Sequence, residues 1–264
     1  MTRRYFGTDG IRGRAGETPI TAQFAQKLGR ALVRVLGKAK PVIAIARDTR
    51  ESGPMLEEAL GRGITSAGGD VRLLGVLPTP GVAAFVVANR LDAGAVISAS
   101  HNPARDNGIK FFSGQGFKLP DATEFAIEEQ LDAEFATDRT GTVSVIEDAA
   151  RQYVAHALRS LPAGFSLHGL KVAVDCANGA AFETTPAALR ALGAEVHVFH
   201  ASPDGSNINS DCGSTVAREI SRLVKESGAR VGLSHDGDAD RLLLCDETGD
   251  PLDGDELLAM AGLD

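Results

Sequence analysis

Three aspartates at alternate positions, Asp236, Asp238 and Asp240, are the residues most clearly suited to chemistry. In an extended backbone their carboxylates would point the same way. Converging carboxylates repel one another unless a cation lies between them, and an all-oxygen ligand set favours magnesium, manganese or calcium over zinc. The apolar residues 231–235 predict a strand that ends just before the triplet, and ligands of open α/β sheets gather at such carboxyl ends. The spacing therefore predicts a site for a hard divalent cation.

Two other structures fit part of this pattern. An EF-hand loop starting at Asp236 would have Glu247 at its twelfth position, but the sixth position, which needs glycine for a sharp turn, is Arg241. The sequence therefore disfavours calcium storage of that kind. A solvated acidic turn, with Gly237 and Ala239 as spacers, stays open on spacing alone.

A second polar segment could bind an anion. Residues 98–103, with the sequence SASHNP, follow an apolar run that predicts a strand, so Ser100 also lies beyond a carboxyl end. A tight loop of this kind offers backbone N–H groups to an anion. The neighbouring Ser100 and His101 do not by themselves make a nucleophile–base pair, and there is no G-x-S-x-G motif. From this segment alone, a capping turn is the favoured interpretation.

The third segment is glycine-rich and lies near the amino terminus. Residues 6–13, FGTDGIRG, place three glycines around Arg12. Glycines let the backbone approach a ligand closely, and a guanidinium is suited to phosphate. A plain surface turn explains the pattern equally well. The chain has no Walker loop, and residues 113–116 are too short a glycine-rich stretch for a dinucleotide fingerprint.

The elements that must hold these segments form two similar series. Apolar runs predict buried strands, and apolar residues at helical spacing predict the helices between them. In the first half we expect strands at residues 42–46, 71–77 and 93–98 and helices at 20–36, 54–67 and 80–89. In the second half we expect strands at 172–175, 195–199, 231–235 and 242–245 and helices at 146–161, 182–192 and 216–227. Strands that alternate with helices predict largely parallel sheets with helices on both faces.

This order predicts the fold class: two similar three-layer α/β/α domains with largely parallel mixed sheets. We expect the first domain, with the loop that carries Ser100, at residues 1–145 and the second, with the acidic loop, at residues 146–256. Residues 132–148 lie between the two series, and residues 133–142 within them lack helical or strand periodicity, so we expect the linker there. Residues 254–264 have the pattern of a helix just beginning, so residues 257–264 are expected to open a third, truncated domain.

Composition limits the classes of partner. The 264 residues carry a formal net charge of −8, which argues against a general nucleic-acid binder but allows a local basic cluster for a small phosphorylated substrate. Cys176, Cys212 and Cys245 form no C-x-x-C pair and are expected to be buried thiols in a reducing compartment. The amino terminus lacks an apolar signal core and no run approaches the length of a membrane span, so we expect a soluble cytoplasmic protein with no membrane partner.

Together these segments resemble the α-D-phosphohexomutase superfamily, over the whole chain and with the motifs in the expected order. Within it the sequence is most similar to the phosphoglucosamine mutases. The further segments that carry the resemblance are residues 5–13 (YFGTDGIRG), 175–180 (DCANGA), 203–209 (PDGSNIN) and 212–215 (CGST).

The resemblance implies roles for individual residues. Ser100 is implied to carry a phosphate in the resting enzyme and to share one Mg²⁺ with the acidic triplet Asp236, Asp238 and Asp240. The other implied site residues lie near the nucleophile or handle phosphoryl charge: His101, Lys110, Arg12 and Arg241. Lys110 is implied to be a general acid/base, and as a base it needs a pKa well below about 10.4. A phosphoserine beside three carboxylates requires an intervening metal ion.

The implied reaction moves phosphate between two positions of a hexosamine. Phosphate passes from Ser100 to glucosamine 6-phosphate, and the resulting 1,6-bisphosphate turns round and returns its other phosphate to the serine. Superfamily members carry two further domains, so the chain is expected to be incomplete, to bind magnesium and to turn over little substrate. A homodimer is compatible with the resemblance. The alternatives are phosphomannomutase or phosphoglucomutase activity, a metal-dependent phosphatase, and a non-catalytic scaffold or metal-binding fragment.

Overall fold

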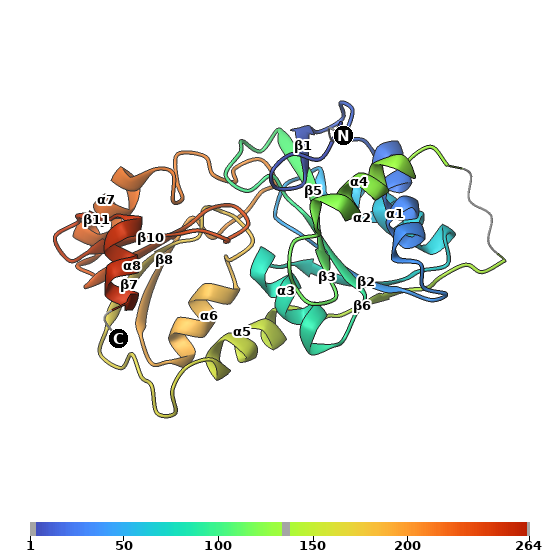
Figure 1. Ribbon diagram of the computed structural model, residues 1–264. Helices are drawn as coiled ribbons and strands as arrows, with labels where there is room; N and C mark the ends of the chain where they lie inside the picture. The colour runs from blue at the N-terminus through green and yellow to red at the C-terminus, as the bar shows by residue number, and fades with distance from the viewer. Residues whose placement is uncertain (1–3, 134–137, 263–264) are drawn as a thin grey trace.

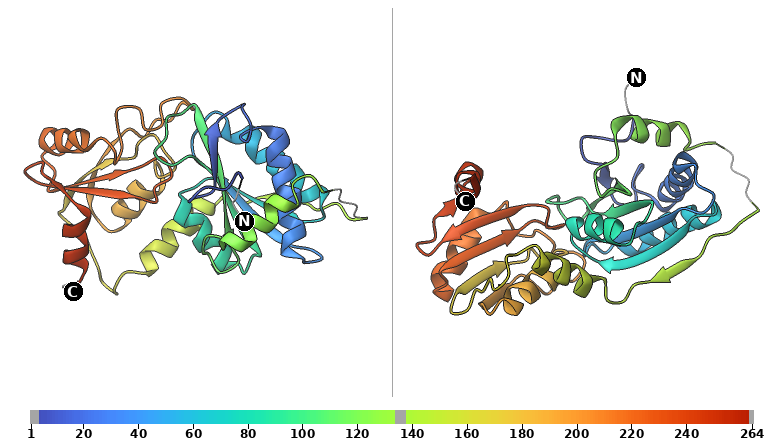
Figure 2. Two further views of the ribbon diagram at one scale, coloured as in Figure 1. Left: turned by 45° about the horizontal axis from the view of Figure 1, so that its top comes forward. Right: turned by 60° about the horizontal axis from the view of Figure 1, so that its bottom comes forward.

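The computed structural model describes residues 4–133 and 138–262. The chain forms two α/β units that lie side by side, one around a six-stranded sheet and one around a five-stranded sheet (Figures 1 and 2). In each unit, core clusters on both faces of the sheet pack against helices. The predicted pair of three-layer α/β/α domains with mixed sheets is confirmed.

The first sheet is parallel at its centre and antiparallel at one edge. Its strands are β1 (Ile11–Arg14), β2 (Val42–Arg47), β3 (Asp70–Val76), β4 (Ala93–Ile97), β5 (Asp106–Ser113) and β6 (Val143–Val145), in the spatial order β1-β5-β4-β2-β3-β6. The strands β2, β3, β4 and β6 pair in parallel, whereas β5 pairs antiparallel with β4 and β1. In this antiparallel edge Arg12 lies opposite Gly108, two residues from Lys110.

Alternate residues of the central strands face the two helix layers. The helices of the first unit are α1 (Ala22–Leu36), α2 (Gly53–Ser66), α3 (Thr79–Ala88) and α4 (Asp121–Glu129). Ile43 and Ile45 of β2 belong to the core shared with α1, α2 and α4, and Ala44 and Ala46 belong to the core shared with α3. Because successive strand side chains point to opposite faces, a strand covered on both sides is a continuous apolar run.

The second unit repeats this plan with fewer elements. Its strands are β7 (Lys171–Asp175), β8 (Glu195–Phe199), β9 (Val231–His235), β10 (Leu242–Asp246) and β11 (Pro251–Leu252), in the order β11-β10-β9-β7-β8. Its helices are α6 (Thr184–Ala191) and α7 (Ala217–Ser227), and the helix α8 (Gly254–Gly262) follows β11 in the chain. The strand β7 pairs in parallel with β8 and β9, and β10 pairs antiparallel with β9. Ala173 packs with α7 on one face, and Val172 and Val174 pack with side chains of α6 on the other.

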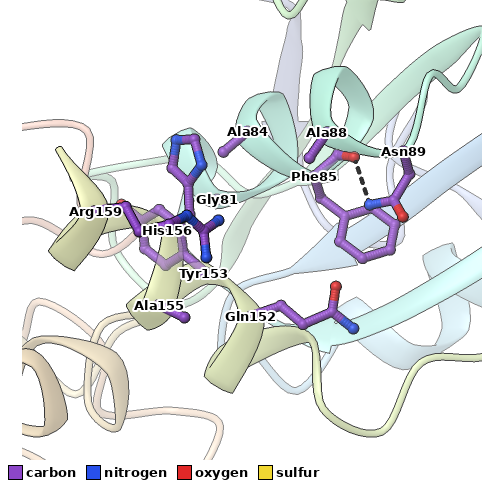
Figure 3. A pocket seen from close by; sticks show the side chains of 10 residues that line it. All are labelled: Gly81, Ala84, Phe85, Ala88, Asn89, Gln152, Tyr153, Ala155, His156 and Arg159. Atoms are coloured by element: carbon purple, nitrogen blue, oxygen red, sulfur yellow. Dashed lines mark hydrogen bonds between the residues drawn. The ribbon is translucent and has the colours of Figure 1, made fainter.

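Helix α5 (Ala149–Arg159) packs against both units. Its Ala149 belongs to the core of the first sheet, and Tyr153 lies beside Gly81 of α3, where an added Cβ would be 3.1 Å from the ring. A pocket of about 210 Å³ remains between α3 and α5, and Figure 3 shows Tyr153 and His156 of α5 at its wall. The helix that was expected to begin the second domain thus also packs against the first unit.

Most predicted elements are confirmed, and the differences concern short or polar strands. The strands at residues 195–199 and 231–235 have the predicted bounds. The strand β6, which pairs in parallel with β3, lies in the stretch assigned to the linker and was not predicted. The residues predicted to lack periodicity, 133–142, contain no helix or strand where the structure describes them, and residues 134–137 lie outside the described residues. A three-residue strand is too short to show a period. The strands β1 and β5 were not predicted, because glycine, asparagine, aspartate and basic residues interrupt their apolar pattern. The nine-residue helix α4 was also not predicted.

The cysteines and the lengths of the described helices agree with the expectations from composition. All three cysteines are buried and free. Burial raises the pKa of Cys176 and Cys212 to about 12, so these thiols stay protonated at neutral pH and are poor nucleophiles. No helix within residues 4–133 and 138–262 has the length and apolar character needed to cross a membrane.

The close crossing of α1 and α2 yields a stability prediction. A Cβ added at Gly63 would lie 2.1 Å from the carbonyl oxygen of Gln26, whereas one added at Gly61 meets nothing within 4 Å. We expect Gly63→Ala to lower the free energy of unfolding by about 1–3 kcal/mol through overpacking. We expect Gly61→Ala on the same helix to raise it by up to about 1 kcal/mol. Urea unfolding measures both, and equal effects of the two substitutions would contradict the packing described here.

Candidate functional site

Ser100 lies in the loop between β4 and β5, with only 1% of its surface exposed. Its φ of 52° is in the left-handed region, which non-glycine residues enter at an energetic cost. A short chain of hydrogen bonds holds this conformation: the Ser100 N–H donates to Ser98 Oγ at 2.9 Å, and the Ser98 hydroxyl donates to Asp48 Oδ2 at 2.6 Å. The nucleophile predicted from the sequence is therefore held in a fixed loop.

The acidic triplet occupies the loop between β9 and β10, as predicted, but its backbone is turned and not extended. Ala239 has a φ of 55°, and its N–H donates to the carbonyl of Asp236 at 3.0 Å. Asp236 and Asp238 are buried, and the side chain of Asp240 is 31% exposed. Ligand oxygens of the three carboxylates lie within 4.8 Å of one another, so a turn brings about the convergence that an extended backbone was expected to give.

The two loops meet across the boundary between the units. The Ser100 hydroxyl donates to Asp236 Oδ2 at 2.6 Å, and His101 Nδ1 lies 3.3 Å from the same hydroxyl oxygen. Gly237 allows this approach, because a Cβ there would be 2.6 Å from the carbonyl oxygen of Ser100. A serine from one sheet and a carboxylate from the other thus form one buried site.

Lys110 on β5 supplies the positive charge inside this site. Its Nζ donates to Asp238 Oδ2 at 2.7 Å and lies 3.4 Å from Asp240 and 3.5 Å from Asp9. Burial lowers the pKa of Lys110, but the carboxylates of Asp238, Asp9 and Asp240 outweigh burial and raise it. In this arrangement Lys110 is a protonated cation, not the free base that a lowered pKa would provide.

Two arginines and a neutral histidine complete the site. Arg12 pairs with Asp9 at 2.6 Å, and Arg241 Nε lies 3.8 Å from Asp240 Oδ1. Burial, together with the charges of Arg241 and Arg12, lowers the pKa of His101, so its ring is neutral at neutral pH. All eight residues predicted for the site lie in the two facing loops or on the β1–β5 edge beside them.

The two buried carboxylates have opposite electrostatic environments. Burial and the charge of Asp238 raise the pKa of Asp236 to about 6. Burial also acts on Asp238, but the neighbouring Lys110 outweighs it and lowers the pKa of Asp238. Asp238 Oδ2 accepts from Lys110 and from the Thr79 hydroxyl, at 2.6 Å for the latter. Asp238 Oδ1 is buried, and no donor among the described residues reaches it, as expected for an oxygen that faces a cation.

A second cluster, Asp175, His200 and Cys212, also has potential metal ligands close together. The carboxylate of Asp175 is already occupied: it accepts from His200 Nδ1 at 3.0 Å and from the N–H groups of Ala177 and Gly213 at 2.9 and 2.7 Å. The Cys212 thiol is protonated. This cluster therefore fixes two loops of the second unit and leaves no ligand set open.

Several residues of the site were not found from the sequence. Asp9 and Thr79 contact the acidic triplet or its lysine, and Asp48 lies beneath the Ser100 loop. Asp9 belongs to a motif that was recognised, so the signal existed. Thr79 begins α3 and Asp48 directly follows β2, and neither has a motif that separates it from ordinary capping or surface residues.

The fold and the site define a two-domain α/β/α protein that holds a serine hydroxyl against an acidic loop across its domain boundary. Known sequences and structures agree with this class. The sequence profile described as phosphoglucomutase/phosphomannomutase, alpha/beta/alpha domain I, matches residues 3–138, and that of domain II matches residues 151–249. The chain belongs to the phosphoglucomutase/phosphomannomutase family.

Two individual relatives show how similar the chain is to known proteins. Phosphoglucosamine mutase of Xanthomonas campestris pv. campestris (strain B100) is 52% identical over 263 residues, which cover 97% of this chain and 59% of that protein. A phosphoglucomutase/phosphomannomutase family protein from Burkholderia thailandensis is 29% identical with a TM-score of 0.85, over 98% of this chain and 58% of its own. The chain thus spans a little under three fifths of the length of these relatives.

A more distant structure shares the fold alone. The N-acetylphosphoglucosamine mutase of Aspergillus fumigatus, solved in complex with GlcNAc-6P and magnesium, is 16% identical with a TM-score of 0.50. The match covers 95% of this chain and 52% of that protein. The likeness of architecture therefore extends to fungal mutases at low identity.

The raised pKa of Asp236 yields a prediction for the metal-free protein. A carboxyl whose pKa rises on folding disfavours the folded state above that pKa, and this penalty is lost as the pH falls toward the unfolded value. In EDTA at pH 7.5 we expect Asp236→Asn to raise the free energy of unfolding by about 1–3 kcal/mol, and this gain to fall by more than half at pH 4.5.

Urea unfolding at the two pH values measures this difference. Asp250→Asn, which changes an exposed carboxylate in the turn after β10, is the matched control and should leave stability nearly unchanged at both. A loss of stability for Asp236→Asn at pH 7.5 would contradict the repulsion described between Asp236 and Asp238.

Proposed function

We propose that the chain carries the nucleophile and the metal site of a phosphoglucosamine mutase, which interconverts glucosamine 6-phosphate and glucosamine 1-phosphate. The observation that carries this proposal is the hydrogen bond of 2.6 Å from Ser100 Oγ to Asp236 Oδ2, which joins the proposed nucleophile to the acidic loop. The identity of 52% to a phosphoglucosamine mutase supports the choice of reaction and sugar. Phosphoglucomutase or phosphomannomutase activity is the second candidate, because the family description names both.

The acidic loop fits one magnesium ion. We propose Asp236, Asp238 and Asp240 as its protein ligands, with Ser100 or its phosphate as a further one. Lys110 and Thr79 occupy Asp238 Oδ2 and leave Oδ1 buried without a donor among the described residues. A cation there would also relieve the repulsion that raises the pKa of Asp236. When bound, the ion polarises phosphoryl oxygens and neutralises charge that develops during transfer.

The proposed reaction is two phosphoryl transfers. In the first, the bond between phosphorus and Ser100 Oγ breaks and a bond from phosphorus to the free sugar hydroxyl forms, which gives the 1,6-bisphosphate. Lys110, protonated because of its raised pKa, gives a proton to Ser100 Oγ and takes up the proton of the sugar hydroxyl. The sugar then turns round, and its other phosphate passes to Ser100 by the reverse steps. Arg12 and Arg241 are proposed to bind the phosphate groups of the sugar. His101 and Arg12 are proposed as catalytic residues beside Ser100 and Lys110.

The remaining predictions about the chain are proposals of the same kind. We propose domain boundaries after residues 145 and 256, with residues 257–264 as the start of a third domain; matches to residues 3–138 and 151–249 support the first boundary. We also propose a phosphorylated hexosamine as substrate, the sugar 1,6-bisphosphate as activator, a cytoplasmic location, a homodimer, and no partner among nucleic acids or membranes.

Phosphorylation of Ser100 tests the proposed function. With Mg²⁺ and glucosamine 1,6-bisphosphate, we expect one phosphate per chain, located on Ser100 by mass spectrometry of peptides. Ser100→Ala should abolish it, and Ser113→Ala, on the far end of β5, should not. Glucose and mannose 1,6-bisphosphates offered separately should phosphorylate Ser100 more slowly. Phosphate on another residue, or none, would contradict the proposal, and rapid release of the phosphate to water would favour a phosphatase.

Magnesium should stabilise the folded chain through the acidic loop. At a concentration 100 times its Kd, a ligand that binds only the folded state adds about 2.7 kcal/mol to the free energy of unfolding. We therefore expect Mg²⁺ to raise the melting temperature, and Asp238→Asn to remove most of this rise. Asp250→Asn should keep it, because Asp250 lies on an exposed turn. A rise that survives Asp238→Asn would mean that Mg²⁺ binds elsewhere.

A further inference from the structure

Arg50 is a fully buried arginine beneath the Ser100 loop, with 0% of its side chain exposed. All five N–H donors of its guanidinium are used. Nε pairs with Asp48 Oδ2 at 2.9 Å, and the four donors of Nη1 and Nη2 reach main-chain carbonyls of the loop, those of Pro103, Asp106, Ser100 and Asn102. A buried cation is thus devoted to the backbone on which the nucleophile sits.

Asn209 of the second unit binds two of the same carbonyls from the other side. Its Nδ2 donates to the carbonyl oxygen of Ser100 at 2.9 Å and to that of Asn102 at 3.1 Å. Its own backbone has a φ of 59° and is held by a hydrogen bond from its N–H to the carbonyl of Ala177 at 2.9 Å. The carbonyls of Ser100 and Asn102 therefore each accept from both units.

The segment that carries Arg50 also joins the two units directly. Thr49 Oγ1 donates to the carbonyl of Asn178, and the N–H of Glu51 donates to the carbonyl of Gly205 at 2.9 Å. Residues on either side of Arg50 thus contact the second unit, while Arg50 itself faces the Ser100 loop. The consecutive residues Thr49, Arg50 and Glu51 therefore contribute both to the contact between the units and to the position of the loop.

We propose that Arg50 and Asn209 are positioning residues, one from each domain, that hold the carbonyls of Ser100 and Asn102 and so aim Ser100 Oγ at the acidic loop. This proposal rests on the proposed function of Ser100. Ser100 is in a left-handed conformation, and its carbonyl and that of Asn102 point inward together; without donors these buried oxygens would be unsatisfied, and the loop would relax. Because Asn209 belongs to the second domain, the nucleophile is aimed only when that domain is in contact.

Replacement of Asn209 by aspartate tests this with little change in shape. Aspartate tolerates a positive φ. Its carboxylate oxygen, however, would face the carbonyl oxygens of Ser100 and Asn102 at the place where the Asn209 amide donates hydrogen bonds. Asn207→Asp is the matched control: it makes the same chemical change in the same part of the second unit, where Nδ2 donates to the carbonyl of Ser202 and not to the Ser100 loop. Arg50→Lys keeps the charge and loses the five-donor fork.

Two measurements distinguish an effect on the position of Ser100 from an effect on the stability of the whole chain. With Mg²⁺ and glucosamine 1,6-bisphosphate, we expect Asn209→Asp and Arg50→Lys to slow phosphorylation of Ser100 by about 10- to 100-fold, as for a misplaced nucleophile. The bisphosphate concentration that gives half the maximal rate should stay within about twofold of that of the unsubstituted chain, since neither side chain is proposed to bind sugar. Hydrogen exchange of the peptide covering residues 98–110 should be faster in both variants and unchanged in Asn207→Asp.

The outcomes are distinct. Phosphorylation and loop exchange like those of the unsubstituted chain in Asn209→Asp would overturn the proposal, as would an equal slowing in Asn207→Asp. If Asn209→Asp fails to fold, Asn209→Gly keeps the positive φ, removes the donor, and should give the same slowing and the same faster exchange. If the unsubstituted chain takes up no phosphate, the proposed function fails, and hydrogen exchange of the loop still decides whether Arg50 and Asn209 hold it.

Discussion

Negative charge buried at the boundary between the two sheets is the constraint that the rest of the structure satisfies. Asp236 and Asp238 are withdrawn from water beside a serine hydroxyl. Like charges in a medium of low polarity repel strongly, so such a pair persists only with compensation. Lys110 compensates one of them through Asp238 Oδ2. The other stays partly uncompensated, which is why its pKa is raised and why the loop is suited to a divalent cation.

The two sheets hold their site loops in the same way. In each unit a central parallel strand ends in a site loop, and an antiparallel strand returns from it: β4 and β5 flank the Ser100 loop, and β9 and β10 flank the acidic loop. A parallel strand collects polar loops at its carboxyl end. The antiparallel return then carries Lys110 back along the site on β5, next to the β1 edge that carries Arg12. The antiparallel edge of the first sheet is therefore what brings cations beside the carboxylates.

The sequence was informative where a run of apolar residues marks a buried strand or where a polar motif marks a site. The apolar strands β2 and β4 were found with bounds correct to within one residue, because burial on both faces leaves a continuous apolar run. The acidic triplet was predicted as a cation site from its spacing, whereas the role predicted for Ser100 depended on the resemblance of its segment to a family. The strand β5 was missed because it begins with Asp106, Asn107 and Gly108, a polar segment that is buried by pairing with β1 and β4. Local composition cannot show that a polar segment has strand partners.

Arg50 and Asn209 were missed for a different reason. Their importance comes from carbonyl groups, which every residue has and no sequence pattern marks. Ser100, Asn209 and Ala239 all have positive φ angles, between 52° and 59°, although none is glycine. Such conformations persist only when surrounding hydrogen bonds determine them. Buried polar groups hold the strained backbone on both sides of the boundary. Arg50 and Asp48 lie beneath the Ser100 loop, and in the second unit Asp175 accepts from the N–H groups of Ala177 and Gly213, on the segments next to Asn209. The positions of the site residues therefore depend on these buried polar side chains as much as on the side chains proposed to take part in the reaction.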